Sequence, residues 1–527
     1  MEEPLRISLG KMIIGSKKVE EYVVLINGKK NDEKIRVLFI NFATSETLEF
    51  FEFNNSKILA DEILDLFQQK KIKTVILNVF EVKTVDFKNN VEFCKVLQAK
   101  FYFFRIPFYF ISPFNFYLNK KIIAANVEIN VGDSLLMFDI DDDKFDAAEL
   151  NFTNDGYEYI NLPKIEYFGN EKLMAQCLQD VIVAECKPLK IILASEFSDL
   201  PLMNKIKEFF FKSMPEKTIF LNGFLNEFNP KCSVEISKWM FDKNNNKFLS
   251  INKTWRQFCI ENIFGQKKFK IIISNDENMD LPFQKSVIVP YSPFDFFFGY
   301  YDSDLKDFVV LDEFKLDSNF HEHKICLKID SNHFSSYKLY GSLIPEIQGL
   351  PDKFNANISS KIPVITFFNN SSFISVDKGH GYEFLKIWND VYGEQMFISF
   401  DEKQPKFGES AIEVFKNKPT TVIFDILSIL AKDGKCFESS WGFEIKKNES
   451  GEILFEFDNF DGIRRKSSAY FFLSLLIRRQ INAIGIEVGQ RPPAICLHIL
   501  VPSNNKEIIM KSFEEACKPL EIDCSFF

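Results

Sequence analysis

Hydrophobic and polar positions in residues 20–104 follow a definite order of elements. Two short apolar runs flank a polar turn around Lys29, which predicts a pair of strands. Leu59 and Ile63 lie at helical spacing with charged residues between them, which predicts an amphipathic helix. The apolar run 74–79 predicts a buried strand, and a second helix is expected after it.

The same order of elements returns in residues 438–527, so the sequence predicts an internal repeat. Lys446 corresponds to Lys29 in the polar turn, and Asn504 corresponds to Asn89 before the second helix. The separation along the chain between equivalent positions is nearly constant, which is not expected of a chance similarity.

Between the two copies, strands continue to alternate with a helix. Residues 135–138 are expected to form a strand, 139–144 a turn and 145–151 a returning strand. Another strand is expected at 190–193, and a helix is expected to begin near Pro201, because proline favours the first helical turn. Such alternation predicts a sheet covered by helices on both faces.

From about residue 268 to residue 340 the pattern changes to short strands separated by polar turns, without helices. This pattern is typical of a small β-sandwich. The expected strands are 269–274, 286–289, 308–316, 324–329 and 337–339.

The predicted fold is therefore α/β, partly duplicated, with an all-β sandwich domain. The expected boundaries are an α/β domain at 1–230, a connector at 231–264, the sandwich at 265–342, a linker at 343–361 and a second α/β domain at 362–527.

Composition and charge exclude several classes of function. The chain of 527 residues has 64 Lys and Arg against 74 Asp and Glu, a formal net charge of −10. A net acidic chain argues against nucleic acid as a partner, because nucleic-acid binding usually needs a basic face. The ten cysteines form no CxxC pair, which is typical of buried, reduced thiols.

No membrane partner is expected either. The apolar stretch Phe101–Leu118 is interrupted by Arg105, Pro107 and Pro113, whereas about 20 predominantly apolar residues are needed to cross a bilayer. The first residues, Met1–Arg6, lack the basic and apolar regions of a signal peptide. The sequence thus predicts a cytoplasmic protein.

The strongest chemical candidate is the acidic hairpin around Asp139. Alternating aspartates at 139, 141 and 143 superficially resemble a calcium-binding loop, but that loop needs Gly and Glu where this chain has Lys144 and Leu150. His321 and His323 could share one face of a strand, but without a third ligand a solvated strand is favoured over a metal site.

Several segments of the chain, in the hairpin and on both sides of it, resemble the heat shock protein 70 family. The sequence FDIDDDKFDAAEL, from Phe138 onward, is similar to the family's second phosphate hairpin, FDLGGGTFDVSIL. The most specific similarity is FGESA from Phe407 followed by PTTVIFD from Pro419, which resembles the family's IGDAA and PxNTVFD. Further similar segments are GKMIIG from Gly10, LPFQK from Leu281 and FKLD from Phe314.

The resemblance implies an actin-like ATPase fold, incomplete and partly duplicated, together with a peptide-binding β-sandwich. The first unit resembles the family from the middle of the ATPase domain through the sandwich, and the second restarts at the ATPase N-terminus near Ile362. Either the two truncated units pack as one rearranged ATPase, or the chain joins remnants of two tandem relatives.

The resemblance also implies a site for ATP and Mg²⁺. Its expected residues are Lys11, Asp139 and Asp146 for catalysis, with Asp139 and Asp146 also at the metal, and Asp141, Asp142, Asp143, Lys144, Ser371 and Ser372 at the nucleotide.

The nucleotide site departs from the family pattern at positions that matter for phosphate binding. Glycines let a backbone approach phosphates closely, but Asp141, Asp142 and Asp143 replace the three hairpin glycines. At about 4 Å, each pair of like charges costs about 1–4 kcal/mol at effective dielectric constants of 80 to 20. In the other phosphate loop, Phe368 and Asn370 replace an acid and a glycine.

The sequence therefore favours a pseudoenzyme: a degenerate chaperone relative that acts through protein binding, with ATPase activity weak or lost. The alternative is a functional ATP-dependent chaperone that binds ATP and unfolded peptides. Unfolded or extended peptide segments and co-chaperones are the expected partners. The run Phe294–Phe298 is expected either to line a peptide pocket or to fill the sandwich core.

Overall fold

In the computed structural model, the described residues form a mixed α/β fold with several sheets. Its described residues are 6–8, 20–140, 145–161, 186–195, 204, 206–208, 210, 212, 214–223, 225–264, 267–276, 279–302, 307–434, 441–500 and 506–527. The chain divides into two compact units, unit 1 (1–255, 276–283 and 329–334) and unit 2 (256–275, 284–328 and 335–527).

The first sheet of unit 1 has the strand order β1-β4-β3-β2-β5-β6. Strands β2, β3 and β4 form an antiparallel meander, β5 pairs in parallel with β2, and β6 pairs in parallel with β5. Val23 to Ile26 of β2 are fully buried, as expected for a central strand covered on both faces. The bounds are β1 Arg6–Ser8, β2 Glu21–Gly28, β3 Ile35–Asn41, β4 Thr47–Phe53, α1 Ser56–Leu66, β5 Lys71–Asn78, α2 Asn90–Phe103 and β6 Phe108–Phe110.

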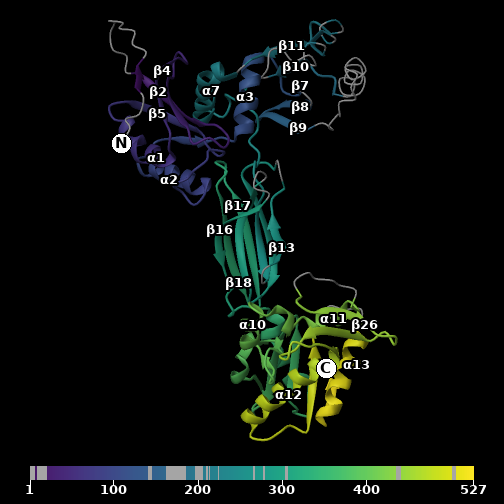
Figure 1. Cartoon of the computed structure of the whole chain (residues 1–527). Coiled ribbons are helices and arrows are strands. Elements are labelled where there is room, and N and C mark those ends of the chain that lie inside the picture. The colour runs from purple at the N-terminus through teal and green to yellow at the C-terminus, as the bar shows by residue number, and fades with distance from the viewer. Residues whose placement is uncertain are drawn as a thin grey trace. The chain divides into compact units, whose positions relative to one another are not determined.

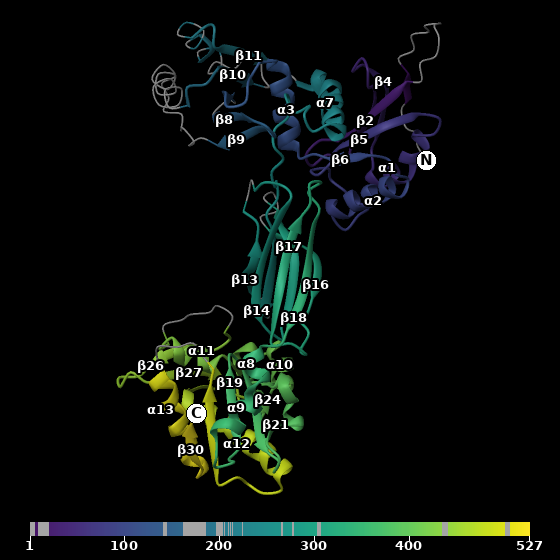
Figure 2. The ribbon, with the colours of Figure 1, turned by 180° about the vertical axis from the view of Figure 1, so that it is seen from behind.

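The second sheet of unit 1 repeats this topology in the order β9-β8-β7-β10-β11. Strands β7, β8 and β9 are antiparallel, whereas β10 and β11 extend the sheet in parallel from β7. Helices α3 and α7 lie side by side between the two sheets (Figures 1 and 2). The bounds are α3 Pro113–Ala125, β7 Ser134–Ile140, β8 Phe145–Thr153, β9 Gly156–Asn161, β10 Lys190–Ser195, β11 Thr218–Asn222, η2 Leu225–Phe228 and α7 Asn229–Phe241.

Unit 2 begins with two antiparallel layers, a four-stranded sheet β13-β12-β15-β16 and a three-stranded sheet β14-β17-β18. Tyr337 of β18 joins the layers, because its ring lies 5.2 Å from that of Phe298 and 4.5 Å from that of Phe314. The five strands expected from the sequence are confirmed, and β12 and β15 are added to them. The bounds are β12 Phe258–Phe264, β13 Lys267–Ser274, β14 Phe283–Pro290, β15 Asp295–Asp302, β16 Asp307–Phe314, β17 Glu322–Ile329 and β18 Ser335–Ser342.

The rest of unit 2 is an α/β lobe whose main sheet has the order β21-β20-β19-β29-β30, with β22 beside β20. Strands β19 to β21 are antiparallel, and β29 and β30 extend the sheet in parallel. The main bounds are β19 Val364–Phe368, β20 Ser371–Asp377, β21 Tyr382–Phe384, β22 Glu394–Gln395, α12 Ala469–Val488, β29 Ala494–Ile499, α13 Lys506–Cys517 and β30 Asp523–Phe526.

Shorter elements lie before this sheet and between β21 and α12. They include a second small sheet, β24-β23-β25, and a third, β26-β27-β28. Their bounds are α8 Pro345–Gln348, α9 Leu350–Asn357, η3 Lys386–Trp388, η4 Asp390–Tyr392, β23 Ile398–Ser399, β24 Lys406–Phe407, α10 Glu409–Phe415, η5 Pro419–Thr421, β25 Val422–Ile423, α11 Ile426–Ala431, β26 Glu444–Lys447, β27 Ile453–Asp458 and β28 Arg464–Ser468, with η6 Lys518–Leu520 after α13.

The order of elements in the predicted repeat is confirmed, whereas Asn504, the predicted counterpart of Asn89, lies outside the described residues. Both copies run through a strand meander, a helix, a strand, a second helix and a last strand, and each meander has a third strand, β4 or β28, beyond the predicted pair. The pairing differs between the copies. In unit 1 the meander joins β5 through β2, whereas in unit 2 the meander is a separate sheet, because β19 already occupies the place beside β29.

The segment expected to be a linker, 343–361, contains helices α8 and α9. Ile347, Leu350 and Phe354 of these helices are fully buried, so the segment contributes to the core of unit 2. The apolar stretch Phe101–Leu118 is divided among α2, β6 and α3. Within the described residues, every helix is too short or too polar to span a bilayer.

Candidate functional site

The acidic hairpin of unit 1 lies between β7 and β8. Asp139 and Asp146 are cross-strand partners at the end of this pair, so the structure brings the two predicted metal ligands together. The other residues predicted for this site lie outside the described residues. They are Lys11, Asp141, Asp142, Asp143 and Lys144.

Asp139 pairs with a lysine that was not predicted from the sequence as a site residue. The Lys121 amine, on α3, forms an ion pair and hydrogen bond with Asp139 Oδ1. The Lys121 side chain is 1% exposed, whereas that of Asp139 is 42% exposed. The Lys121 amine also lies 3.8 Å from the ring centre of Tyr117, one helical turn earlier, a cation–π arrangement.

Local sequence fixes the helix that carries Lys121. Ser112 caps its start, because Ser112 Oγ accepts a hydrogen bond from the Asn115 N–H at 3.1 Å, and Pro113 occupies the first turn. Lys121 then lies on a helix face that packs into the unit, next to the fully or nearly buried Leu118 and Ile122. A buried amine must be compensated by charge or hydrogen bonds, which Asp139 supplies.

The cavity beside this ion pair is very small. It measures about 20 Å³ and is lined by Lys121, Asp139, Asp146 and Tyr159, among others. That is about the space of one water molecule. Burial, and then the negative charges of the two aspartates, raise the pKa of the Tyr159 hydroxyl.

The described residues around Asp139 do not by themselves fit a magnesium–nucleotide site. The ammonium of Lys121 already neutralises the carboxylate that would face the metal, and the cavity is too small for a phosphate chain. Among the described residues no group of three or more acidic, cysteine or histidine side chains is placed to hold a metal ion.

The second predicted site lies in unit 2, at the turn between β19 and β20. Ser371 Oγ accepts a hydrogen bond from Gln395 Nε2 at 2.5 Å, and Ser371 lines a larger pocket. Ser372 is 1% exposed, and its Oγ and backbone oxygen both accept from Trp388 Nε1, at 3.2 and 3.1 Å. The structure therefore places Ser371 at a possible ligand site and Ser372 in the core.

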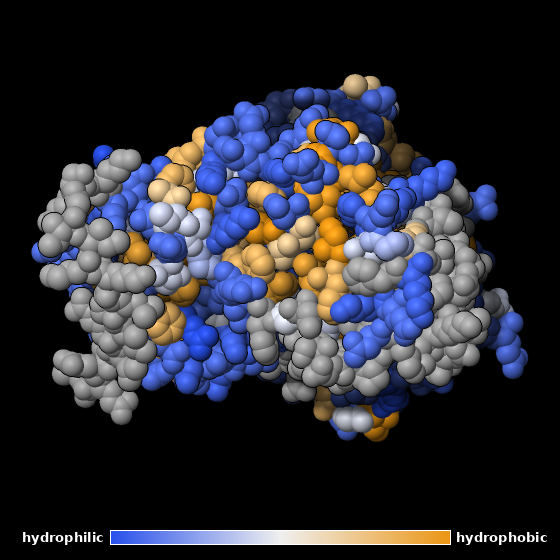
Figure 3. Space-filling model, turned by 90° about the horizontal axis from the view of Figure 1, so that it is seen from above, coloured by the Kyte–Doolittle hydropathy of each residue, from blue (hydrophilic) through white to orange (hydrophobic). Residues whose placement is uncertain are grey.

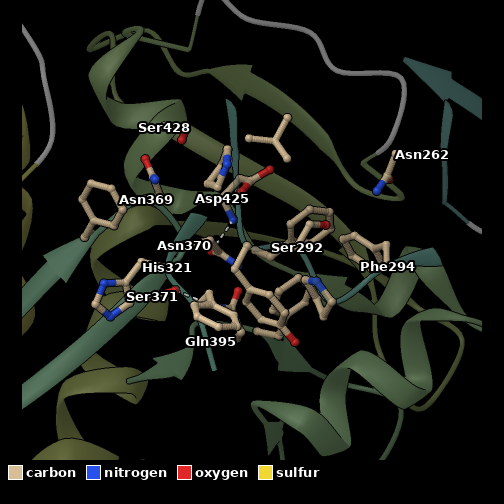
Figure 4. A pocket seen from close by; sticks show the side chains of 18 of the residues that line it. Asn262, Ser292, Phe294, His321, Asn369, Asn370, Ser371, Gln395, Asp425 and Ser428 are labelled. Atoms are coloured by element: carbon tan, nitrogen blue, oxygen red, sulfur yellow. Dashed lines mark hydrogen bonds between the residues drawn. The ribbon is translucent and has the colours of Figure 1, made fainter. Parts of the chain in front are cut away.

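This pocket of unit 2 has a volume of about 500 Å³, within the range of small-molecule sites. In the view of Figure 4, Asn262 and Phe294 lie on one side, whereas Asn369, Asn370 and Asp425 lie on the other. The polar or charged side chains along its wall are Asn262, Tyr291, Ser292, His321, Asn369, Asn370, Ser371, Tyr392, Gln395, Asp425, Ser428, Lys432 and Trp441.

Internal hydrogen bonds hold several of these polar groups in place. Asn370 Oδ1 accepts from the Asp425 N–H at 2.9 Å, and Asp425 Oδ2 accepts from Trp441 Nε1 at 3.2 Å. His321 Nδ1 accepts from the Ile344 N–H at 3.0 Å, and its Nε2 lies 2.6 Å from the Val391 carbonyl.

These contacts assign His321 as a neutral ring. Because Nδ1 accepts a hydrogen bond, the proton is on Nε2, which donates to the Val391 carbonyl. Burial also lowers the pKa of His321. The histidine therefore contributes no positive charge to the pocket at neutral pH.

Asn262, on β12, is the second residue of interest that sequence reasoning missed. It is 3% exposed and lines the pocket, and no donor among the described residues reaches its Oδ1 within hydrogen-bond distance. The signal in the sequence was the polar pair Glu261 and Asn262 inside the apolar run FCIENIF. For Lys121 the signal was the charged pair Lys120 and Lys121 directly before the apolar run 122–125.

The comparisons with known proteins give no family for this chain. No protein-family model matches the sequence, and no curated protein matches it significantly.

Proposed function

We propose that this protein is a divergent member of the heat shock protein 70 family that binds extended protein segments and has lost, or nearly lost, ATP turnover. The strand order supports the family proposal. Three sheets among the described residues share one topology, an antiparallel meander extended by two parallel strands, as an actin-like ATPase with a partly duplicated lobe requires.

The observation that carries the loss of ATP turnover is the Lys121–Asp139 ion pair. An ATP-dependent member of the family needs the hairpin carboxylate for its metal, but here a lysine of the same unit neutralises it beside a cavity of about 20 Å³. The hairpin glycines are also replaced by Asp141, Asp142 and Asp143, which repel phosphates.

Surface character supports protein contacts. Figure 3 shows hydrophobic residues gathered near the middle of one face, with hydrophilic residues around them. Contiguous apolar surface of this kind is typical of interaction sites. The sandwich of unit 2 also ends in edge strands, β13 and β16 in one sheet and β14 and β18 in the other, and extended segments bind such edges by strand addition. Extended peptides, and co-chaperones, are the proposed partners.

The proposed location is the cytoplasm. Cys232 and Cys326 are buried thiols, as expected in a reducing compartment.

Peptide binding tests this function. A panel of fluorescent, extended apolar peptides should bind the full chain, and the affinity should be unchanged by millimolar Mg-ATP. Absence of binding by every peptide would overturn the protein-binding role. Release of bound peptide by Mg-ATP would instead show an ATP-driven chaperone.

A further inference from the structure

We propose that the end of helix α2 attaches the protein to the surface of an anionic lipid bilayer. The contact is made by residues 100–105, here called the aromatic tip, in which Tyr102, Phe103 and Phe104 are consecutive. This inference does not depend on the proposed function, because it rests only on residues of unit 1. The expectation of no membrane partner rested on the lack of a membrane-spanning segment, and attachment at a bilayer surface needs none.

The side chains of the aromatic tip are unusually exposed. Tyr102 is 80% exposed, Phe103 78% and Phe104 56%, and no other three consecutive large hydrophobic side chains among the described residues are exposed. Phenylalanine is normally a core residue, and a contiguous exposed apolar patch, unlike a single exposed side chain, is typical of an interaction site.

The backbone holds these side chains outward. The Ile106 N–H donates to the Phe101 carbonyl at 2.9 Å, and the Arg105 N–H donates to the Tyr102 carbonyl at 3.1 Å. With Arg105 at a φ of 55°, these bonds form a Schellman motif, a common end of a helix. Phe101 and Ile106 pack into the core of unit 1 on either side of the exposed residues. The aromatic tip is therefore formed before any partner arrives.

The charge of this segment complements an anionic surface. Residues 93–127 contain no aspartate or glutamate, although the whole chain has a formal net charge of −10. Lys95 and Arg105 are exposed, and Lys100 is partly exposed. Within the part of the chain that the structure describes, no ion pair is found for any of these three cations. Lysine and arginine near an anionic bilayer each strengthen its attraction for a protein.

A bilayer fits the aromatic tip better than the flat face of a protein partner. Successive side chains of an α-helix point about 100° apart, so the three exposed rings spread around the helix end. The rings of Phe103 and Phe104 touch edge to face, with centres 5.1 Å apart. A flat surface covers one side of such an end, whereas the interface of a bilayer surrounds it. Aromatic side chains are enriched at that interface, and lysine and arginine extend from it toward the headgroups.

Sedimentation of the full chain with lipid vesicles tests this attachment. Vesicles of phosphatidylcholine with about 30% phosphatidylserine should bind the chain at least about tenfold more tightly than vesicles of phosphatidylcholine alone. Salt at about 0.5 M should weaken the binding, because it screens the attraction between exposed charges. Failure to sediment with the mixed vesicles, or equal affinities for the two compositions, would overturn the proposal.

Variants then locate the contact. Phe103→Ser should weaken binding to the mixed vesicles about tenfold, because one inserted ring is lost. The exposed position of Phe103 leaves the fold intact in this variant. Arg105→Asn tolerates the positive φ and should weaken binding about fivefold, the value of one cation near the bilayer surface.

Phe460→Ser is the matched control. Phe460 is 50% exposed in the turn between β27 and β28 of unit 2, where both neighbouring arginines are paired with aspartates. Because those cations are neutralised, Phe460→Ser should bind vesicles like the native chain. Binding that is unchanged by Phe103→Ser, or that falls equally in both serine variants, would contradict the assignment. Self-association that Phe103→Ser abolishes, without any vesicle binding, would show instead that a second copy of the chain covers the tip.

Discussion

Asp139→Asn removes a carboxylate that neutralises the almost fully buried Lys121 amine, so it should destabilise unit 1. Breaking a fully buried ion pair by removing one partner costs about 3–5 kcal/mol. The Asp139 side chain is 42% exposed, and its remaining hydration lowers the expected loss to about 1–3 kcal/mol. The size of the loss therefore measures how far the fold relies on this internal pair.

A double-mutant cycle isolates the pair itself. Lys121→Met keeps the length of the apolar stem, and the coupling between Lys121→Met and Asp139→Asn should be about 1–2 kcal/mol in favour of the native pair. Asp146→Asn is the matched control. Asp146 is exposed across the same hairpin and no ion pair is found for it among the described residues, so its substitution should change stability by less than about 0.5 kcal/mol.

Amide hydrogen exchange of peptides from β7 and β8 is the suitable assay, because it reports the local free energy of opening and does not require the whole chain to unfold in one step. If Asp139 is instead a metal ligand, the carboxylates of Asp139 and Asp146 repel each other across the hairpin when no metal ion is bound. Asp139→Asn would then be neutral or stabilising, and the coupling with Lys121 would vanish, which would refute the reasoning.

The remaining predictions concern stability in the two units. Burial lowers the pKa of His333 to about 3 from an ordinary 6.5. The unfolded chain therefore binds a proton at this histidine between pH 6.5 and pH 3 and the folded chain does not, so unit 1 loses stability as the pH falls through this range. His333→Asn, which tolerates the positive φ of 65° there, should reduce the pH slope of unit 1 stability by about 1.4 kcal/mol per pH unit in this window, as measured by denaturation at several pH values. Phe294→Ala should lower the stability of unit 2 by about 3 kcal/mol, because it empties a core position next to Phe397, and an unchanged melting temperature would count against this packing. Ser372→Ala should cost less than about 1 kcal/mol in a thermal melt, because Trp388 Nε1 still donates to the backbone oxygen of residue 372 at 3.1 Å, and a larger loss would show that Oγ is the main acceptor.

Local pattern was sufficient to predict many elements. The predicted strand 74–79 overlaps β5, whose buried residues are 74–77, because a strand covered on both faces must be largely apolar. Asn89 marks the start of α2 because its Oδ1 accepts a hydrogen bond from the Glu92 N–H at 3.0 Å and so caps the helix. Signals of this kind depend on neighbouring residues only, and they are visible in the sequence.

Sheet pairing and the candidate sites depend on contacts between distant residues. The same kind of meander joins β5 in unit 1 but stands apart in unit 2, and this difference depends on whether another strand, β19, competes for the edge. The Lys121–Asp139 pair joins a helix to the following strand, and Asn262 becomes notable only because, in the folded chain, no donor among the described residues meets its buried Oδ1. Such long-range pairing has no periodic signature.

The most direct test of the central claim is a calorimetric titration of the purified full-length chain with Mg-ATP and Mg-ADP. With Lys121 neutralising Asp139 and with aspartates in place of the hairpin glycines, no heat of binding is expected up to millimolar nucleotide. Micromolar binding of either nucleotide would show a working cleft and would contradict the proposed loss of the site.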